Sequence, residues 1–163
     1  VSERLCKKMK ILVPGEEDNK FRFVHKGLVR QYYVFKEKEI NVQFSDVNDI
    51  VVAFASYMGH QPSDYFIEAL EPAELFTITR ENMDYLMSQG PNFISFGKKI
   101  SASLCNEKSL RERELLNYGA LGRLQNFMDT KTDLFLRLPQ IYIASYLNIQ
   151  PETFSALKKK IVY

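Results

Sequence analysis

Near the C-terminal end of the chain, the spacing of apolar residues predicts two short helices joined by a tight turn. Ile141, Ala144 and Leu147 recur at three-residue intervals, which makes one face of the first helix apolar and narrow. Pro139 suits the first turn of this helix, and Asn148 tolerates the left-handed backbone of the turn that follows. The segment therefore has the pattern of a helix-turn-helix.

The second helix of this pair is expected to begin at Pro151, because proline is favoured in a first turn. Ile149, Phe154 and Leu157 can pack back on the first helix and leave an outer face that could enter a DNA major groove. The same spacing also occurs in small helical proteins that bind no DNA. Whether this helix pair binds DNA must therefore be judged from the rest of the sequence. The outer residues are Gln150, Glu152, Thr153, Ser155 and Lys158 to Lys160.

The N-terminal half has a different pattern, in which short apolar runs alternate with turn residues between Lys8 and Ile78. Phe21 and Phe23 alternate with Arg22, and a further apolar run begins after Gly27, as in antiparallel strands joined by a tight turn. Such runs indicate β-strands. About seven short strands would form a barrel or a sandwich.

Beyond Thr79 the apolar residues change to helical spacing. Met83 and Leu86 fall on one face of a predicted helix over residues 80–88. Thr79 followed by Asn82 is a capping pattern for the start of this helix. The strands therefore end at Thr79.

The longest predicted helix runs from about Asn92 to Asn117, after the helix-breaking pair Gly90 and Pro91. At about 1.5 Å per residue it would be about 40 Å long. Its apolar residues form one stripe, which would lie either on the chain's own barrel or on a second copy of the chain. We expect a dimer interface at Phe93, Phe96, Ile100 and Leu104. After this helix, Gly119 and Gly122 predict a hinge, followed by a helix over residues 123–128.

The chain has 163 residues, a length that suits one ordinary domain or two small ones. Hydrophobic residues make up 45% of it and charged residues 26%, which is the composition of a soluble protein that can bury a core. The net charge of +2 is too small to indicate a nucleic-acid binder by itself. The basic surplus is C-terminal, however, because Arg137 and Lys158 to Lys160 are balanced only by Glu152 in the last part of the chain.

Cys6 and Cys105 are far apart, and neither has a second cysteine at metal-ligand spacing. Since no signal peptide is evident, we expect free thiols in a reducing compartment and a cytoplasmic protein. The longest apolar run, residues 50–55, is too short to span a bilayer, so no membrane partner is expected. His25 and His60 lack neighbouring ligands and no nucleophile motif occurs, so we expect no catalytic residue, metal or cofactor.

Three segments and their order resemble the Crp/Fnr family of bacterial transcription regulators. The segments are FRFVHKGLVRQYYV (21–34), YFIEALEPAELFTITRENMDYL (65–86) and YIASYLNIQPETFSALKK (142–159). The last looks like IASYLGITPETLSRIRKK of the branch common in Bacteroidetes, with Asn148 for the turn glycine and Ala156 for an arginine. The resemblance covers nearly the whole chain.

This resemblance implies an α+β fold with an N-terminal antiparallel β-barrel or jelly roll like a cyclic-nucleotide-binding domain, a long dimerisation helix and an all-α helix-turn-helix. It also implies a homodimer that binds double-stranded DNA. The expected domains are a β-barrel sensor over 1–90, a dimerisation helix over 91–117 and a helix-turn-helix DNA-binding domain over 118–163.

The expected effector pocket departs from nucleotide-binding members of the family. Those members carry a Gly-Glu pair and an Arg followed by Ser or Thr, which grip the ribose and the cyclic phosphate. Counting back from Ala69 places Val52, Ala53, Ser63 and Asp64 at these positions, joined by a loop over residues 56–62. We therefore expect a degenerate pocket that does not bind cyclic nucleotide, which leaves room for an unidentified small-molecule effector.

The predicted reading helix also departs from the family, because Ala156 stands where an arginine would contact guanine. We expect DNA contacts from Gln150, Glu152, Thr153, Ser155, Lys158, Lys159 and Arg137. Two functions remain open: a homodimeric transcription regulator, or a ligand-binding or protein-interaction module that has lost specific DNA binding.

Overall fold

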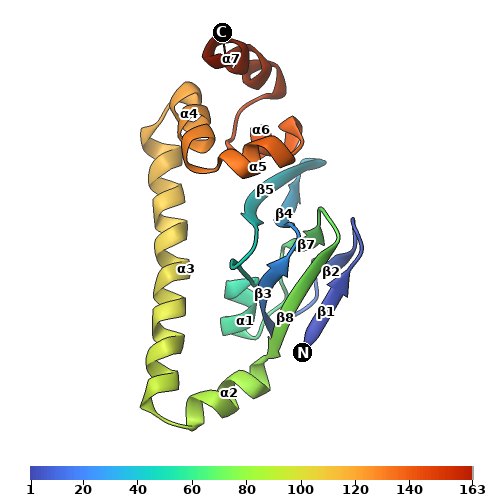
Figure 1. Cartoon of the computed structure of the whole chain (residues 1–163), viewed down its shortest axis with the longest axis vertical. Coiled ribbons are helices and arrows are strands. Elements are labelled where there is room, and N and C mark those ends of the chain that lie inside the picture. Colours follow the sequence, from blue (N-terminus) through green and yellow to red (C-terminus); the bar gives the residue numbers. More distant parts are fainter. Residues whose placement is uncertain (163) are drawn as a thin grey trace. The chain divides into compact units, whose positions relative to one another are not determined.

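The computed structural model describes residues 1–162 and divides into two compact units. The first, Val1–Ile94, contains the described strands and is called the sheet unit. The second begins at Ser95 and is called the helical unit. The boundary lies within the long helix α3 (Pro91–Asn117), which is one continuous helix in Figure 1.

The sheet unit contains two four-stranded antiparallel sheets, in the orders β1-β8-β3-β6 and β2-β7-β4-β5. Strands at matching positions in the two orders, such as β3 and β4, are consecutive in sequence, which is the topology of a jelly roll. The strands are β1 (Ser2–Leu5), β2 (Lys10–Leu12), β3 (Lys20–Lys26), β4 (Val29–Phe35), β5 (Lys38–Ser45), β6 (Ile50–Val51), β7 (Phe66–Ala69) and β8 (Ala73–Thr79). The sequence pattern missed β1, whose residues are mostly polar.

The core of the sheet unit lies between its two sheets, because every second residue of a strand points to the same face. Val24 and Leu75 from one sheet and Val29 and Ile67 from the other belong to a single buried cluster. The turn between β3 and β4 depends on Gly27, whose φ of +93° is a conformation that favours glycine. The described hydrogen-bond ladders keep the two sheets separate, so the expected barrel is a two-sheet jelly roll.

Two short helices belong to the sheet unit. α1 (Phe54–Gly59) occupies part of the segment that the sequence predicts as a loop, and it ends at His60 in a left-handed conformation. A helix this short is below the length at which an apolar period can be recognised. α2 (Arg80–Ser88) is confirmed together with its cap, because Thr79 Oγ1 accepts a hydrogen bond of 3.4 Å from the Asn82 N–H.

The helical unit contains the rest of α3 and four shorter helices. These are α4 (Ala120–Thr130), α5 (Thr132–Arg137), α6 (Gln140–Tyr146) and α7 (Pro151–Val162). Their core includes Leu124, Phe127, Ile143 and Phe154, each almost fully buried. Gly122 lies inside α4, so the predicted hinge is wrong at that position and only Gly119, the N-cap residue, lies outside the helix. A single glycine costs a helix only about 1 kcal/mol and does not break it.

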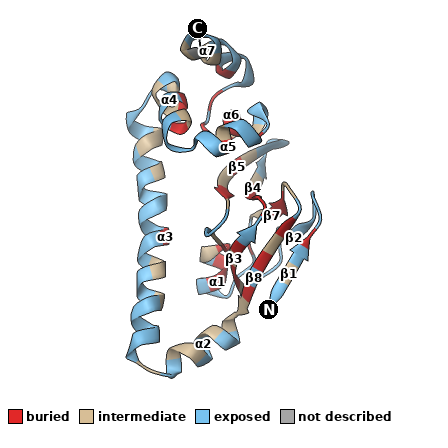
Figure 2. Cartoon of the chain, in the orientation of Figure 1, coloured by how far each residue is buried: buried red, intermediate tan, exposed pale blue. Residues whose placement is uncertain are grey.

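Most of α3 is exposed, as Figure 2 shows. Phe93 and Phe96 are exposed, Ile100 is half-buried, and Leu104 is the one buried residue of the helix. Among the described residues, no helix combines the length and apolar character that a membrane crossing requires.

Candidate nucleic-acid interface and effector site

The tight turn between α6 and α7 is built on Asn148, whose φ of 51° is left-handed, as the sequence predicts. Helix α6 closes with a hydrogen bond from Leu147 N to Ile143 O of 2.8 Å, and Ile149 N reaches Ala144 O at 2.9 Å. These bonds satisfy carbonyls at the end of α6 that no helical N–H can reach. The backbone can therefore enter α7 at Pro151 directly after the turn.

The contact between α6 and α7 is apolar and differs in detail from the sequence pattern. Ile143, Leu147, Ile149 and Phe154 are buried, whereas Ile141 is 61% exposed. Ala144 and Leu147 of the predicted face are buried as expected, but Ile143 takes the place of Ile141. The buried face of α6 is therefore rotated about the helix axis relative to the predicted face. Pro139 is the N-cap residue of α6 rather than a first-turn residue, and Leu157 is half-buried.

The outer face of α7 presents most of the residues predicted to contact DNA. Exposed residues on or next to this helix are Gln150, Glu152, Thr153, Ser155, Ala156 and Lys159. The Ser155 hydroxyl donates to Pro151 O at 3.0 Å, and so leaves its lone pairs available. Lys158 is half-buried, and its ammonium lies 5.4 Å from the centre of the Phe135 ring on α5. Arg137, at the end of α5, is exposed.

Two arginines that the sequence analysis did not single out contact the turn between α6 and α7. Arg123 of α4 donates to Asn148 O at 3.2 Å, and Arg111 of α3 donates to Tyr146 O. Sequence alone gives no signal for either contact, because arginine is common on the polar side of a helix.

The positions expected to hold an effector are placed in the sheet unit. Val52, Ala53 and Ser63 are buried, and Asp64 is exposed. Ala53 N donates to Asp18 Oδ2 at 2.8 Å, so its backbone N–H is already used inside the protein. The Ser63 hydroxyl accepts a hydrogen bond of 3.0 Å from Tyr65 N, within its own turn.

A buried ion pair that the sequence analysis missed lies beside these positions. Arg22 donates to Asp18 through Nη2–Oδ1 at 2.9 Å and Nη1–Oδ2 at 3.1 Å, and the two side chains are 3% and 0% exposed. Arg22 lies two residues before Val24, a residue of the core cluster, so the two side chains point to the same face of β3. The cation inside the jelly roll is therefore already neutralised by a carboxylate.

Arg30 of β4 is a second buried and paired arginine. It forms ion pairs with Glu68 at 2.7 Å and Glu39 at 2.6 Å, and its guanidinium lies 3.9 Å from the centre of the Tyr32 ring. Burial, followed by the charge of Glu68, raises the pKa of the Tyr32 hydroxyl to about 12. The nearby Arg30 guanidinium opposes this rise, because a positive charge favours the ionised phenol.

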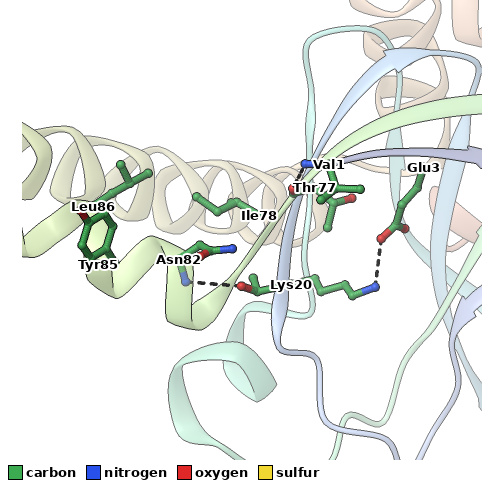
Figure 3. A pocket seen from close by; sticks show the side chains of 9 residues that line it. Val1, Glu3, Lys20, Thr77, Ile78, Asn82, Tyr85 and Leu86 are labelled. Carbon is green, nitrogen blue, oxygen red and sulfur yellow. Dashed lines mark hydrogen bonds and ion pairs between the residues drawn. The ribbon is translucent and has the colours of Figure 1, made fainter.

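A groove with a volume of about 560 Å³ lies between the start of β1, the end of β8 and α2. Figure 3 shows the side chains that line it. Its apolar residues include Ile78 and Leu86, and the Lys20 ammonium at its edge is ion-paired with Glu3 at 2.9 Å. None of the four expected effector positions lines this groove. Within the described residues, no three His, Cys, Asp or Glu side chains are grouped as ligands for a metal ion.

Neither a protein-family model nor a curated protein matches the sequence. Solved structures match nearly the whole chain. FixK2 from Bradyrhizobium japonicum is 16% identical with a TM-score of 0.84, over 99% of this chain and 83% of that one. A CooA mutant from Carboxydothermus hydrogenoformans is 21% identical with a TM-score of 0.74, over 99% and 75%.

The c-di-GMP responsive global regulator CLP of Xanthomonas campestris is 15% identical with a TM-score of 0.73, over 99% of this chain and 86% of that one. At these identities the likeness establishes the fold. The chain thus has the α+β fold predicted from its sequence: an antiparallel jelly roll, a long helix and a C-terminal helix-turn-helix.

Proposed function

We propose that the chain is a DNA-binding transcription regulator of the Crp/Fnr type, in the Bacteroidetes-like branch, that works as a cytoplasmic homodimer. The observation that carries this proposal is the exposed polar face of α7, presented by a helix-turn-helix with a left-handed Asn148 in its turn. The likeness of almost the whole chain to structures that include the regulator CLP supports it. The proposed domains remain a sensor over 1–90, a dimerisation helix over 91–117 and a DNA-binding domain over 118–163.

In this proposal, phosphate contacts and base contacts come from different residues. Lys159 and Arg137 are exposed cations at the ends of α7 and α5, and both suit the phosphate backbone. Lys158 can join them by moving its long side chain from the Phe135 ring. The base-reading residues would be Gln150, Glu152, Thr153 and Ser155.

The proposed dimer forms along α3. Phe93 and Phe96 are exposed aromatic residues on this helix, at 43% and 55% of their surface. Burying what remains exposed against a second copy would contribute about 1 kcal/mol for each side chain. Ile100 continues the same stripe toward Leu104, which was predicted for the interface but is already buried within one chain. A two-fold dimer would place two reading helices at half-sites about 34 Å apart.

The proposed sensor does not bind cyclic nucleotide. A cyclic phosphate entering the jelly roll would have to displace Asp18 from Arg22 and leave a buried carboxylate unpaired. Breaking a buried pair in this way costs about 3–5 kcal/mol. Any small-molecule effector of this chain would therefore need a chemistry other than an isolated phosphate.

A second candidate function is a ligand-binding or protein-interaction module that keeps the helix-turn-helix frame without specific DNA binding. Ala156, exposed on α7, favours it, because an alanine makes no polar contact with a base. The nearby carboxylate of Glu152 would also repel phosphates.

Binding to mixed DNA fragments, followed by fluorescence anisotropy at a series of salt concentrations, separates the two functions. A DNA-binding protein releases counterions, so the logarithm of its affinity falls linearly with the logarithm of salt, by about 0.9 per phosphate contact. The variant Lys159→Gln with Arg137→Gln should lower that slope by about 2. Absence of binding even at low salt would instead favour the interaction module.

A further inference from the structure

A guanidinium from α4 contacts one carbonyl of the helix-turn-helix turn and two carbonyls at the end of α3. Arg123 Nη2 donates to Asn148 O at 3.2 Å, and Arg123 Nη1 donates to Tyr118 O at 2.7 Å and to Leu115 O at 3.5 Å. Leu115 lies in the last turn of α3, and Tyr118 follows directly after it. A single planar group thus bridges the C-terminal end of α3 and the left-handed residue of the turn.

A second guanidinium holds the end of α6. Arg111 of α3 donates through Nη2 to Tyr146 O, and its guanidinium carbon lies 3.6 Å from the centre of the Tyr146 ring. Tyr146 is buried and also packs against Phe127 of α4, with ring centres 5.6 Å apart. Arg111 therefore contacts both the carbonyl and the ring of the residue at which α6 ends.

Arg111 at Tyr146, and Arg123 at Leu115 and Tyr118, each place a cation at the C-terminal end of a helix, where the carbonyls carry partial negative charge. Arginine suits this role because its planar fork donates in fixed directions, whereas a lysine ammonium is a single point of charge on a flexible stem. A fork that bonds two elements fixes their relative orientation as well as their separation.

We propose that Arg111 and Arg123 are positioning residues that lock the helix-turn-helix turn, and with it α7, to the end of α3. This inference rests on the proposed function, since a fixed angle between α3 and α7 matters most when two reading helices must fit two half-sites together. The guanidinium groups act through backbone carbonyls of their own chain and contact no DNA.

The first test uses Arg123→Lys and Arg111→Lys, which keep the charge and remove the fork, with Arg113→Lys as the matched control. Arg113 lies on the same helix as Arg111 and is exposed. Fluorescence anisotropy against a selected DNA site should show about tenfold weaker binding for each test variant, an unchanged salt slope, and wild-type affinity for Arg113→Lys. If the two arginines instead contacted phosphates, their lysine variants would bind like wild type, and the proposal would fail.

The second test needs no DNA and measures the position of α7 directly. Cys105 is an exposed native thiol on α3, so spin labels at Cys105 and at Lys160→Cys, in a Cys6→Ser background, report the distance from α3 to α7. Labelled chains are mixed with excess unlabelled chains, so that distances within one chain dominate.

The wild-type distance distribution should be narrow, and Arg111→Lys combined with Arg123→Lys should broaden it while the circular dichroism of the helices is retained. An unchanged distribution overturns the positioning role, even if DNA affinity falls. A broadened distribution in a protein that binds no DNA would support the positioning role and contradict the proposed function, so the two failures are distinguishable.

Discussion

Asp18 and Arg22 form a bidentate ion pair inside the jelly roll, with oxygen–nitrogen distances of 2.9 and 3.1 Å. Asp18 Oδ2 also accepts the Ala53 N–H, and Asp18 N donates to the buried hydroxyl of Ser56. One carboxylate therefore ties β3 to the start of α1. In the proposed effector pocket, the cation beside Ala53 is therefore already paired with a carboxylate.

We predict that the protein does not bind cyclic AMP or cyclic GMP. The physical reason is that a buried phosphate needs an unpaired cation or several aligned donors, and Ser63 and Asp64 supply neither. Isothermal titration with either nucleotide should show no heat of binding up to about millimolar ligand. A saturable isotherm in the micromolar range would refute the placement of the pocket and the argument from the ion pair.

Replacing Gly27 by alanine should destabilise the sheet unit strongly. The new Cβ atom would lie 2.5 Å from Pro72 O and 2.7 Å from the Ala73 backbone, and the φ of +93° is itself unfavourable for alanine. Urea denaturation should show the free energy of unfolding lowered by about 3 kcal/mol.

Gly15→Ala is the matched control, because Gly15 has a similar φ of +92° and nothing within 4 Å of its added Cβ. It should lower the free energy of unfolding by only about 1 kcal/mol. Equal effects of the two alanines would show that the close approach at Gly27 does not matter in solution.

The proposed dimer should dissociate when a charge is placed on the exposed stripe of α3. Phe96 is 55% exposed, so Phe96→Glu removes an apolar contact between copies without disturbing the fold of one chain. Leu104 is less suitable for this test because it is buried within the chain. Light scattering should show a dimer for the wild type at micromolar concentration and a monomer for Phe96→Glu.

Leu116→Glu serves as the comparison for the dimer test, because Leu116 is 78% exposed and lies on roughly the opposite side of an ideal helix from Phe96. It should remain a dimer. A monomeric wild type, or a dimer that survives Phe96→Glu, would count against α3 as the interface.

Restoring an arginine on the reading helix should sharpen base preference. Ala156 is exposed on the outer face of α7, and Ala156→Arg could make a bidentate contact with guanine worth about 1–3 kcal/mol of discrimination. Sites selected by the variant should gain a guanine at one position of each half-site. A selected motif identical to that of the wild type would mean that α7 does not lie in the major groove as proposed.

The order of elements and the turn at Asn148 could be predicted from the sequence, because each rests on a local rule: period two for strands, period three to four for helices, and the backbone tolerance of asparagine. The alternation of Phe21, Arg22 and Phe23 does not reveal which face of β3 points into the core. The structure buries Arg22 beside Val24, because Asp18 four residues earlier supplies a paired carboxylate.

Contacts between residues far apart in the chain could not be predicted from the sequence either. Arg123 meets the turn at Asn148 across 25 residues, and Arg111 meets Tyr146 across 35, so no short-range pattern identifies either pair. The exposure of Ile141 was missed because three-residue spacing fits more than one face of a short helix.

The most direct test of the account is to select binding sites for the wild-type protein from a random double-stranded DNA library at physiological salt. A homodimer reading with two copies of α7 should enrich a two-fold symmetric motif whose half-site centres are about 10 base pairs apart, one helical turn. Enrichment of no motif, or of a single half-site without its symmetric partner, would contradict the proposal of a dimeric transcription regulator.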